Sequence, residues 1–407
     1  MRIAVHVLVL ALSLAALRSI AAAEEAGARL VSGPYAVALT TEGATICWQT
    51  KGKSAGAVRV KAEGKAESRE FKEAGAADFH AVKLTGLAAG TVHQVEVLAA
   101  PGGAALGGLS LRTAPKQADS FTFFAYGDTR TNAAAHEQVV AALVAESKRL
   151  KQQTFLLHTG DLASGGSNEA QTAEQFFRPA APALERLPII VARGNHECGT
   201  DLFPKYFPEP ARPEASGKAD DQCFDYGSVR ILVLDQYTRT KSEDGRMKWL
   251  AAKLAEAKDR WRIVIFHEPI YSSGSHGSNL GFRRQVEPIL TAGKVHAVFA
   301  GHDHDYERTK PISGVTHLTV GGGGAPLRGK GAGAGADWSV KFEVTTHFLT
   351  VTVSPEKLSF RAFCPSGKGD EFEEFDAFEI PKDCAWPAAK AEEAPREQPA
   401  TAGQAAP

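Results

Sequence analysis

The chain has 407 residues with a formal net charge of −1, and 43% of its residues are hydrophobic while 23% are charged. The length allows one large domain and a smaller one, and the hydrophobic fraction is sufficient for a sizeable core. Because binding to nucleic acid or to an anionic membrane surface needs a basic excess, the near-neutral charge argues against both kinds of partner.

The first 23 residues have the composition of a targeting segment. Arg2 precedes an apolar stretch at 3–17, and small residues at 21–23 come before Glu24. This order predicts a secretory signal at 1–23, cleaved near Ala23. The apolar stretch is shorter than the ~20 residues that a spanning helix needs. We therefore expect a secreted or periplasmic protein without a membrane span, with an uncleaved anchor as the alternative.

Export would permit disulfides among the five cysteines. Cys198 with Cys223, and Cys364 with Cys384, are the pairs closest in sequence, and each would join a loop-rich stretch. Cys47 lies in a strand-like run beside a tryptophan. The prediction is two disulfides and one buried thiol.

Residues 24–117 consist of short alternating segments separated by turn residues, with Gly-rich breaks at 86–90 and 102–108. This spacing favours a β-sandwich. No cluster of catalytic residue types occurs there, and His80 and His93 are expected to be ordinary sheet residues. The domain itself is expected to serve in support or docking. The candidate strands are 34–40, 44–50, 57–61, 80–84, 92–99 and 109–113.

Residues 118–385 alternate between apolar runs and segments of helical spacing, which is typical of the α/β class. The pattern predicts a largely parallel sheet with helices on both faces, and in such sheets ligands gather beyond the carboxyl ends of the strands. The apolar runs are 121–126, 154–158, 188–192, 229–234, 262–266 and 295–300, and the helical segments are 133–150, 169–187, 245–258 and 282–291.

The last part of the chain begins with four glycines at 321–324, followed by a Gly- and Ala-rich stretch to 336. No Lys-Ser pair opens a helix after them, so the P-loop pattern fails, and a mobile surface loop is expected. Segments 339–353 and 358–363 are predicted to be closing antiparallel strands. Residues 386–407 are mostly Ala, Glu, Pro and Gln and are predicted to be a disordered tail.

Side chains that suit metal ions follow five of the apolar runs. Taken singly, each of these residues would more often be a turn or capping residue. Together, however, carboxylates, an amide and imidazoles suit iron, manganese or zinc. Side chains at i and i+2 of an extended segment point the same way, so His302 and His304 could each hold one of two neighbouring ions. Two metal ions held side by side in this way promote in-line displacement at phosphorus. The clusters are Gly127-Asp128, Gly160-Asp161, Gly194-Asn195-His196, His267 and Gly301-His302-Asp303-His304.

This series, with Gly194-Asn195-His196-Glu197 and Phe266-His267-Glu268-Pro269 in order, resembles the calcineurin-like metallophosphoesterases, and specifically their purple acid phosphatase branch. That branch carries a fibronectin-III-like domain in front. Gly33-Pro34-Tyr35, Cys47-Trp48-Gln49-Thr50 and Leu84-Thr85-Gly86-Leu87 are similar to its sequence. The resemblance covers about 34–363. It implies a fibronectin-III-like β-sandwich followed by an α/β/β/α metallophosphoesterase sandwich.

The resemblance also implies a role for each matching residue. Two ions (Fe, Zn or Mn) would share Asp161, and metal-bound hydroxide would attack a phosphate monoester. His196 and His276 match histidines that contact phosphate and protonate the leaving group. Asp128 and His304 would complete the first ion's ligands, and Asn195, His267 and His302 would hold the second ion.

Two positions depart from the family pattern. Ser164 stands where purple acid phosphatases have a tyrosine. The first ion would therefore keep only three protein ligands and be held less tightly, and the enzyme would be colourless or pale. Arg130 stands where many other metallophosphoesterases have a ligating histidine. Its guanidinium can grip a phosphate oxygen, with a salt bridge as the alternative. Glu307 and Arg308 are expected to form a structural ion pair near the site.

Two other functions compete with an exported phosphate monoester hydrolase. A phosphodiesterase or nucleotide-cleaving enzyme would use the same metal core with different substrate-facing loops. A weakly active envelope or cell-surface binding module would use the sandwich for attachment. The sequence leaves the oligomeric state open.

Overall fold

The computed structural model describes residues 28–117, 120–151, 154–208, 221–238, 243–331 and 335–386. The expected signal at 1–23 and residues 387–407 of the expected tail lie outside these ranges. Among the described residues, no helix has the length and apolar character needed to cross a membrane.

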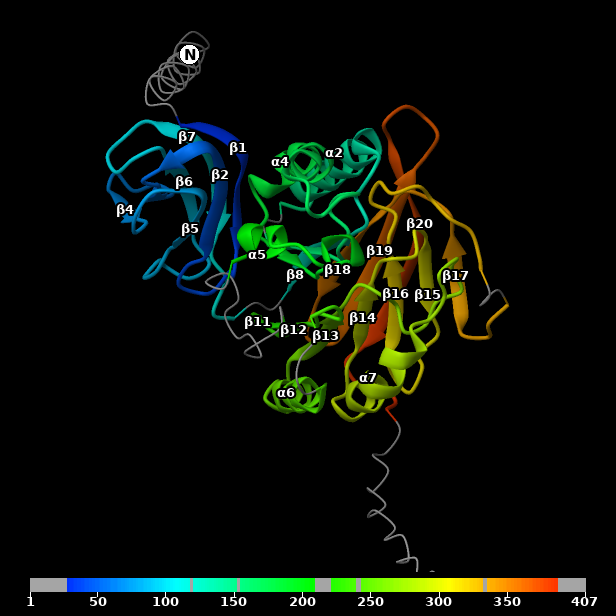
Figure 1. Ribbon diagram of the computed structural model, residues 1–407. Helices are drawn as coiled ribbons and strands as arrows, with labels where there is room; N and C mark the ends of the chain where they lie inside the picture. Colours follow the sequence, from blue (N-terminus) through cyan, green and yellow to red (C-terminus); the bar gives the residue numbers. More distant parts are fainter. Residues whose placement is uncertain are drawn as a thin grey trace, which may run out of the picture.

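The N-terminal part is a β-sandwich, as expected (Figure 1). One sheet has the order β1-β2-β5 and the other β4-β3-β6-β7. Ile46, Trp48 and Val58 are among the buried residues of its core. The sequence missed β4, because its five residues are exposed or half-buried and show no apolar alternation. The strands are β1 (Arg29–Val37), β2 (Thr45–Ser54), β3 (Ala57–Ala62), β4 (Ser68–Lys72), β5 (Ala77–Lys83), β6 (Val92–Leu98) and β7 (Ala105–Arg112).

The remaining strands form two sheets. The first has the order β10-β9-β8-β18-β19-β20 and the second β11-β12-β13-β14-β16-β15-β17. The strands are β8 (Phe121–Tyr126), β9 (Leu156–His158), β10 (Ile189–Val191), β11 (Gln222–Tyr226), β12 (Val229–Val233), β13 (Trp261–Ile265), β14 (Ala297–Ala300), β15 (Tyr306–Thr309), β16 (Thr316–Val320), β17 (Ser339–Glu343), β18 (Phe348–Val353), β19 (Lys357–Pro365) and β20 (Phe372–Pro381).

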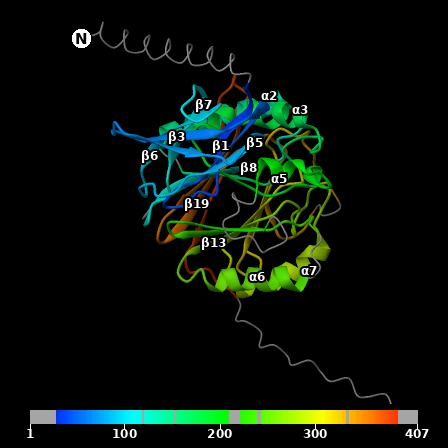
Figure 2. The ribbon, with the colours of Figure 1, turned by 60° about the vertical axis from the view of Figure 1, so that its left-hand side comes forward.

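Helices cover the outer face of each sheet. In Figures 1 and 2, α2 lies at the top of the molecule and α6 and α7 lie at the bottom, with the strands between them. The result is an α/β/β/α sandwich. Its helices are α2 (Ala133–Arg149), α3 (Glu169–Thr172), α4 (Arg178–Leu184), α5 (Leu202–Tyr206), α6 (Glu243–Ala255) and α7 (Leu280–Ala292), with a π-helical turn η1 (Ala173–Phe177) and a 3-10 turn η2 (Asn195–Glu197).

The α/β/β/α sandwich that the resemblance implied is confirmed, whereas the prediction from the apolar runs, a largely parallel sheet with helices on both faces, was wrong. Parallel pairing joins β8, β9 and β10 in the first sheet, with β9 in the middle, and it joins β12, β13, β14 and β16 in the second. Antiparallel strands extend both sheets. Alternate residues of a strand point to opposite faces. Phe123 of β8 therefore packs between the sheets, whereas Phe124 packs toward α2 and α4. An unbroken apolar run does not reveal whether a helix or a second sheet covers it.

The sandwich packs directly against the two-sheet domain. The Tyr35 hydroxyl donates a hydrogen bond to the Tyr206 carbonyl oxygen at 2.6 Å, and the Tyr35 and Phe177 rings lie 5.1 Å apart. Gln49 donates to the Glu169 carboxylate at 2.9 Å. These contacts agree with a supporting role for the sandwich.

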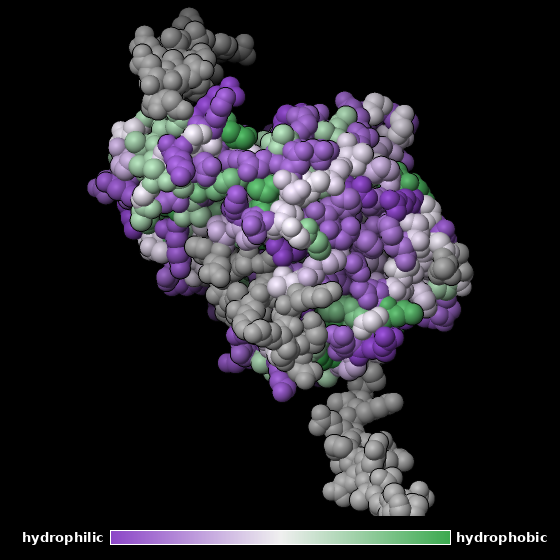
Figure 3. Space-filling model, viewed as in Figure 1, coloured by the Kyte–Doolittle hydropathy of each residue, from purple (hydrophilic) through white to green (hydrophobic). Residues whose placement is uncertain are grey.

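On the face of the molecule seen in Figure 3, hydrophilic residues predominate and hydrophobic ones form small, separate patches.

The two expected disulfides do not form. Cys364 and Cys384 are free thiols, and Cys198 is also a free thiol, so it is not joined to Cys223. Cys364 faces Glu373 of the neighbouring strand, and the Cys384 thiol donates to the Pro381 carbonyl oxygen at 3.0 Å. Closeness in sequence therefore did not predict pairing. Cys47 is a buried thiol, as expected.

Candidate metal centre

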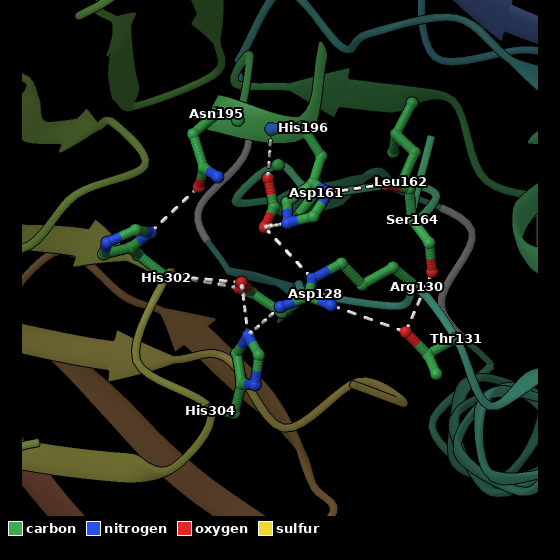
Figure 4. A network of polar contacts seen from close by, with 12 residues as sticks. Asp128, Arg130, Thr131, Asp161, Leu162, Ser164, Asn195, His196, His302 and His304 are labelled. Atoms are coloured by element: carbon green, nitrogen blue, oxygen red, sulfur yellow. Dashed lines mark hydrogen bonds and ion pairs between the residues drawn. The ribbon is translucent and has the colours of Figure 1, made fainter. Parts of the chain in front are cut away.

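The predicted ligand residues follow the carboxyl ends of parallel strands in both sheets. Asp128 follows β8, Asp161 follows β9 and Asn195 follows β10. His267 follows β13, and His302 begins the loop after β14. Because these strand ends meet at one edge of the two-sheet core, side chains that are far apart in the sequence converge there (Figure 4).

The side chains expected to hold the second ion, here the second-ion group (Asp161, Asn195, His267 and His302), lie in mutual contact. Asn195 Oδ1 is 3.1 Å from His267 Nε2 and 2.9 Å from His302 Nδ1. Asp161 Oδ1 is 3.3 Å from His267 Nε2. Ligands bound at about 2.0–2.2 Å to one ion are neighbours at such separations.

The hydrogen bonds of His267 show why this group suits a cation. Its Nδ1 lies 2.8 Å from the Thr159 carbonyl oxygen, so Nδ1 carries a proton and donates it. Nε2 then faces two oxygens, Asn195 Oδ1 and Asp161 Oδ1. In the neutral ring, three electron-pair donors would meet with nothing between them. A proton or a metal ion at this point resolves the conflict, so the residues fit an ion.

The charge balance at this point agrees. Burial lowers the pKa of His267, but Asp161 and Asp128 outweigh it and raise the pKa to about 10. Burial, followed by the charge of His267, lowers the pKa of His302 to about 3, which keeps that ring neutral. One ligand atom each of Asp128, Asp161 and His267 lies within 4.8 Å of the others, and all three residues are buried.

The backbone is strained where the ligand residues sit. Asp128, Asp161 and His302 have φ values of 57°, 56° and 66°, in the left-handed region that residues with a Cβ seldom occupy. Close packing also requires glycine directly before two of the ligand residues, because a larger residue would collide with a neighbouring ligand. A Cβ on Gly301 would lie 2.1 Å from Asp128 Oδ2, and one on Gly194 would lie 2.2 Å from Asp161 Oδ1.

Glu197 holds two of the ligand loops together, and the sequence interpretation gave it no role. Its buried carboxylate accepts hydrogen bonds from the backbone N–H groups of Asp161 at 3.0 Å, Leu162 at 2.9 Å and Gly194 at 2.9 Å. Burial, followed by the charge of Asp161, raises the pKa of Glu197 to about 7. Its position directly after Gly194-Asn195-His196 was the available signal.

The side chains expected to hold the first ion, here the first-ion group (Asp128, Asp161 and His304), are spaced more widely. His304 Nε2 lies 3.8 Å from Asp128 Oδ1. The Arg130 side chain reaches both His304 and Asp161, with Nη2 3.2 Å from His304 Nε2 and Nε 3.4 Å from Asp161 Oδ2. Arg130 therefore contacts two members of the group rather than standing apart from it (Figure 4).

Both histidines predicted to contact substrate lie beside the ligands. His196 donates from Nδ1 to the Ser164 carbonyl oxygen at 2.7 Å, and its Nε2 is 3.7 Å from Asp161 Oδ2. The His276 ring is 4.2 Å from the His302 ring, with 32% of its side chain exposed. Its Nδ1 lies 3.0 Å from Asp303 Oδ1.

Arg328 is a further residue at this edge that the sequence interpretation missed. Its Nη1 lies 2.7 Å from His276 Nε2, and its backbone N–H donates to the His304 carbonyl oxygen at 3.1 Å. It follows the glycines at 321–324, which were expected to lie in a mobile surface loop. That expectation was wrong for these four residues. They are buried, and a Cβ on Gly321 would lie 2.1 Å from the Asp303 carbonyl oxygen.

The polar side chains of Ser164, Glu307 and Arg308 have partners of their own. Ser164 Oγ lies 2.9 Å from Thr131 Oγ1 and 3.0 Å from Gln175 Oε1. The expected pair of Glu307 with Arg308 does not form, because neighbouring strand residues point to opposite faces. Glu307 instead accepts from the Ser273 N–H and hydroxyl, and Arg308 pairs with Asp376 at 2.8 Å.

Comparisons with known proteins agree with this geometry. Residues 121–306 match the family model of the calcineurin-like phosphoesterases. The chain is 30% identical over 188 residues to purple acid phosphatase 21 of Arabidopsis thaliana, which covers 40% of this chain and 43% of that protein. It is 26% identical over 285 residues to probable inactive purple acid phosphatase 24 of the same plant, covering 58% of this chain and 44% of that protein. The chain thus matches less than half the length of these curated relatives.

Among solved structures, a purple acid phosphatase from yellow lupin (Lupinus luteus) seeds superimposes with a TM-score of 0.70 at 17% identity, covering 87% of this chain and 74% of that one. PhoD superimposes with a TM-score of 0.64 at 13% identity, covering 86% and 90%. At these identities the likeness shows the fold. Residues 121–306 therefore match the calcineurin-like phosphoesterase family model, in a chain that is similar in sequence to purple acid phosphatases and is folded like one.

Proposed function

We propose that the protein is an exported, metal-dependent hydrolase of phosphate monoesters. The observation that carries the proposal is the convergence of the second-ion group, in which Asn195 Oδ1, Asp161 Oδ1 and two imidazole nitrogens lie about one ligand spacing apart. These four side chains would hold one ion. The first-ion group offers a second place, with Asp161 shared between the two.

The protein's own residues would prepare the substrate. Bound ions would supply an activated water and neutralise charge on the phosphoryl oxygens. His196 lies beside Asp161 and His276 lies beside His302, where both can contact those oxygens, and Arg130 presents a guanidinium that suits them. His276 is the more exposed histidine, with 32% of its side chain accessible against 26% for His196. We therefore assign it to the leaving-group side.

Turnover of 4-nitrophenyl phosphate by protein loaded with Fe, Zn or Mn tests the proposal. We expect Asp161→Ala to abolish turnover, because it removes a carboxylate shared by both groups. The matched control is Asp370→Ala, which changes an exposed aspartate outside the β19 and β20 strands and should leave turnover unchanged.

Bis(4-nitrophenyl) phosphate, assayed in parallel, tests the choice of substrate. We expect faster hydrolysis of the monoester. Faster hydrolysis of the diester would replace the monoesterase with a phosphodiesterase. No turnover of either substrate with any of the three metals would favour a binding module.

A further inference from the structure

The first-ion group already contains a cation that belongs to the chain. The Arg130 side chain is 13% exposed and extends toward the ligand side chains. Its Nη2 lies 3.2 Å from His304 Nε2, and its Nε lies 3.4 Å from Asp161 Oδ2. Figure 4 shows the guanidinium among Asp128, Asp161 and His304.

The nitrogen atom that Arg130 contacts on His304 is the one that an ion would need. His304 Nδ1 lies 2.7 Å from the Pro326 carbonyl oxygen, which can only accept, so Nδ1 carries the proton. Nε2 of the neutral ring then has one lone pair, and it accepts a hydrogen bond from Arg130 Nη2. One lone pair cannot serve a guanidinium and a metal ion together.

Charge leads to the same exclusion. A guanidinium stays protonated in proteins and has five donors and no acceptor, so it repels a metal ion and cannot ligate it. Asp128 and Asp161 are buried carboxylates, and the positive charge of Arg130 compensates them as an ion would. In the second-ion group, by contrast, an amide oxygen and two imidazoles meet one carboxylate, and their contacts are with one another.

We propose that Arg130 competes with the first metal ion, so that the guanidinium and the ion exclude each other. The protein then holds one ion tightly through the second-ion group and admits another only when Arg130 leaves His304 and Asp161. Thr131 Oγ1, 3.4 Å from Arg130 Nη1 on the exposed side of the group, is a partner for the displaced side chain. This inference rests on the metal-binding part of the proposed function.

Metal stoichiometry without substrate tests the competition. Purified protein is loaded with Zn or Mn and dialysed, its metal content is measured by elemental analysis, and both affinities are measured by calorimetry. We expect one retained ion per chain in the wild type, with a second ion bound at least roughly tenfold more weakly. Arg130→Met, which keeps the length of the side chain without its charge, should retain two ions. Arg130→Lys should behave more like the wild type.

The matched control is Arg178→Met, since Arg178 pairs with Glu174 on the surface at 2.7 Å and its side chain is 50% exposed. It should retain one ion. Circular dichroism and urea unfolding check that each variant is folded. Two tightly held ions in the wild type, or one ion in a folded Arg130→Met protein, would overturn the competition while leaving the phosphatase proposal intact. No bound ion in any of these proteins would instead overturn the metal-dependent function.

Discussion

Single side chains in this site are fixed by hydrogen bonds to the backbone. The carbonyl oxygens of Thr159 and Pro326 accept hydrogen bonds from Nδ1 of His267 and His304, respectively, which leaves Nε2 of each ring facing the centre. His276 is held differently. Its Nδ1 faces Asp303 Oδ1 and its Nε2 faces Arg328 Nη1. Because a guanidinium only donates, His276 Nε2 accepts from Arg328 and carries no proton in this arrangement. To protonate a leaving group through Nε2, His276 must part from Arg328 and take up a proton there.

We therefore expect His276→Ala to slow esters with poor leaving groups more than activated ones, because only the former need a proton as the bond breaks. The loss with phenyl phosphate should be on the order of 100-fold or more, and the loss with 4-nitrophenyl phosphate should be much smaller. Steady-state kinetics with both substrates measures the ratio. Equal losses would remove the acid role and leave His276 with a binding role.

At the scale of elements, short connections after parallel strands carry the chemistry. The loop after β9 provides Asp161, and the turn η2 after β10 provides Asn195. One buried carboxylate, that of Glu197, accepts from both segments and so keeps their ligands at a fixed distance. The same element order explains the wrong expectation for the glycines at 321–324. They continue β16 into the centre, where the Gly323 N–H donates to the Gly127 carbonyl oxygen at 2.8 Å.

Glu197→Gln should weaken both folding and metal binding. A glutamine has one acceptor oxygen where the carboxylate has two, so at least one of the three buried N–H groups would lose its partner, at a cost of about 1–3 kcal/mol. Urea unfolding and metal affinity by calorimetry measure the two effects. Glu174→Gln is the control, because the Glu174 side chain is 62% exposed. If both variants behaved alike, Glu197 would not be needed to hold the two ligand loops together.

Across the whole molecule, buried histidines tie stability to pH. His317 of β16 is 5% exposed and packs 4.9 Å from the Tyr271 ring. Burial, followed by the charge of Arg283, lowers the pKa of His317 to about 3. A histidine in the unfolded chain has a pKa near 6.5. The unfolded state therefore binds the proton first, and the contribution of His317 to stability is present above pH 6.5 and is lost as the pH falls toward 3.

His317→Leu should remove this dependence. As the pH falls from 6.5 to 5, the free energy of unfolding of the variant should rise by about 1.6 kcal/mol relative to the wild type, because the unfolded wild-type histidine goes from half to almost fully protonated. Urea unfolding of both proteins at the two pH values measures the change. Parallel dependence in the two proteins would show that His317 titrates normally or that its burial is relieved at low pH.

The sequence by itself determined the sandwich, the strand ends at which the candidate ligands stand and the α/β class, because alternation, apolar runs and the glycines before Asp128, Asp161, Asn195 and His302 are local patterns. The apolar runs did not show that two sheets face each other, since a buried run looks the same against a helix or a sheet; only the family resemblance implied it, and the tertiary structure confirmed it. The tertiary structure alone brought Arg130 against His304, 174 positions away, and Glu197 against the Asp161 loop. Contacts between distant segments depend on how whole elements pack, and no local pattern encodes that.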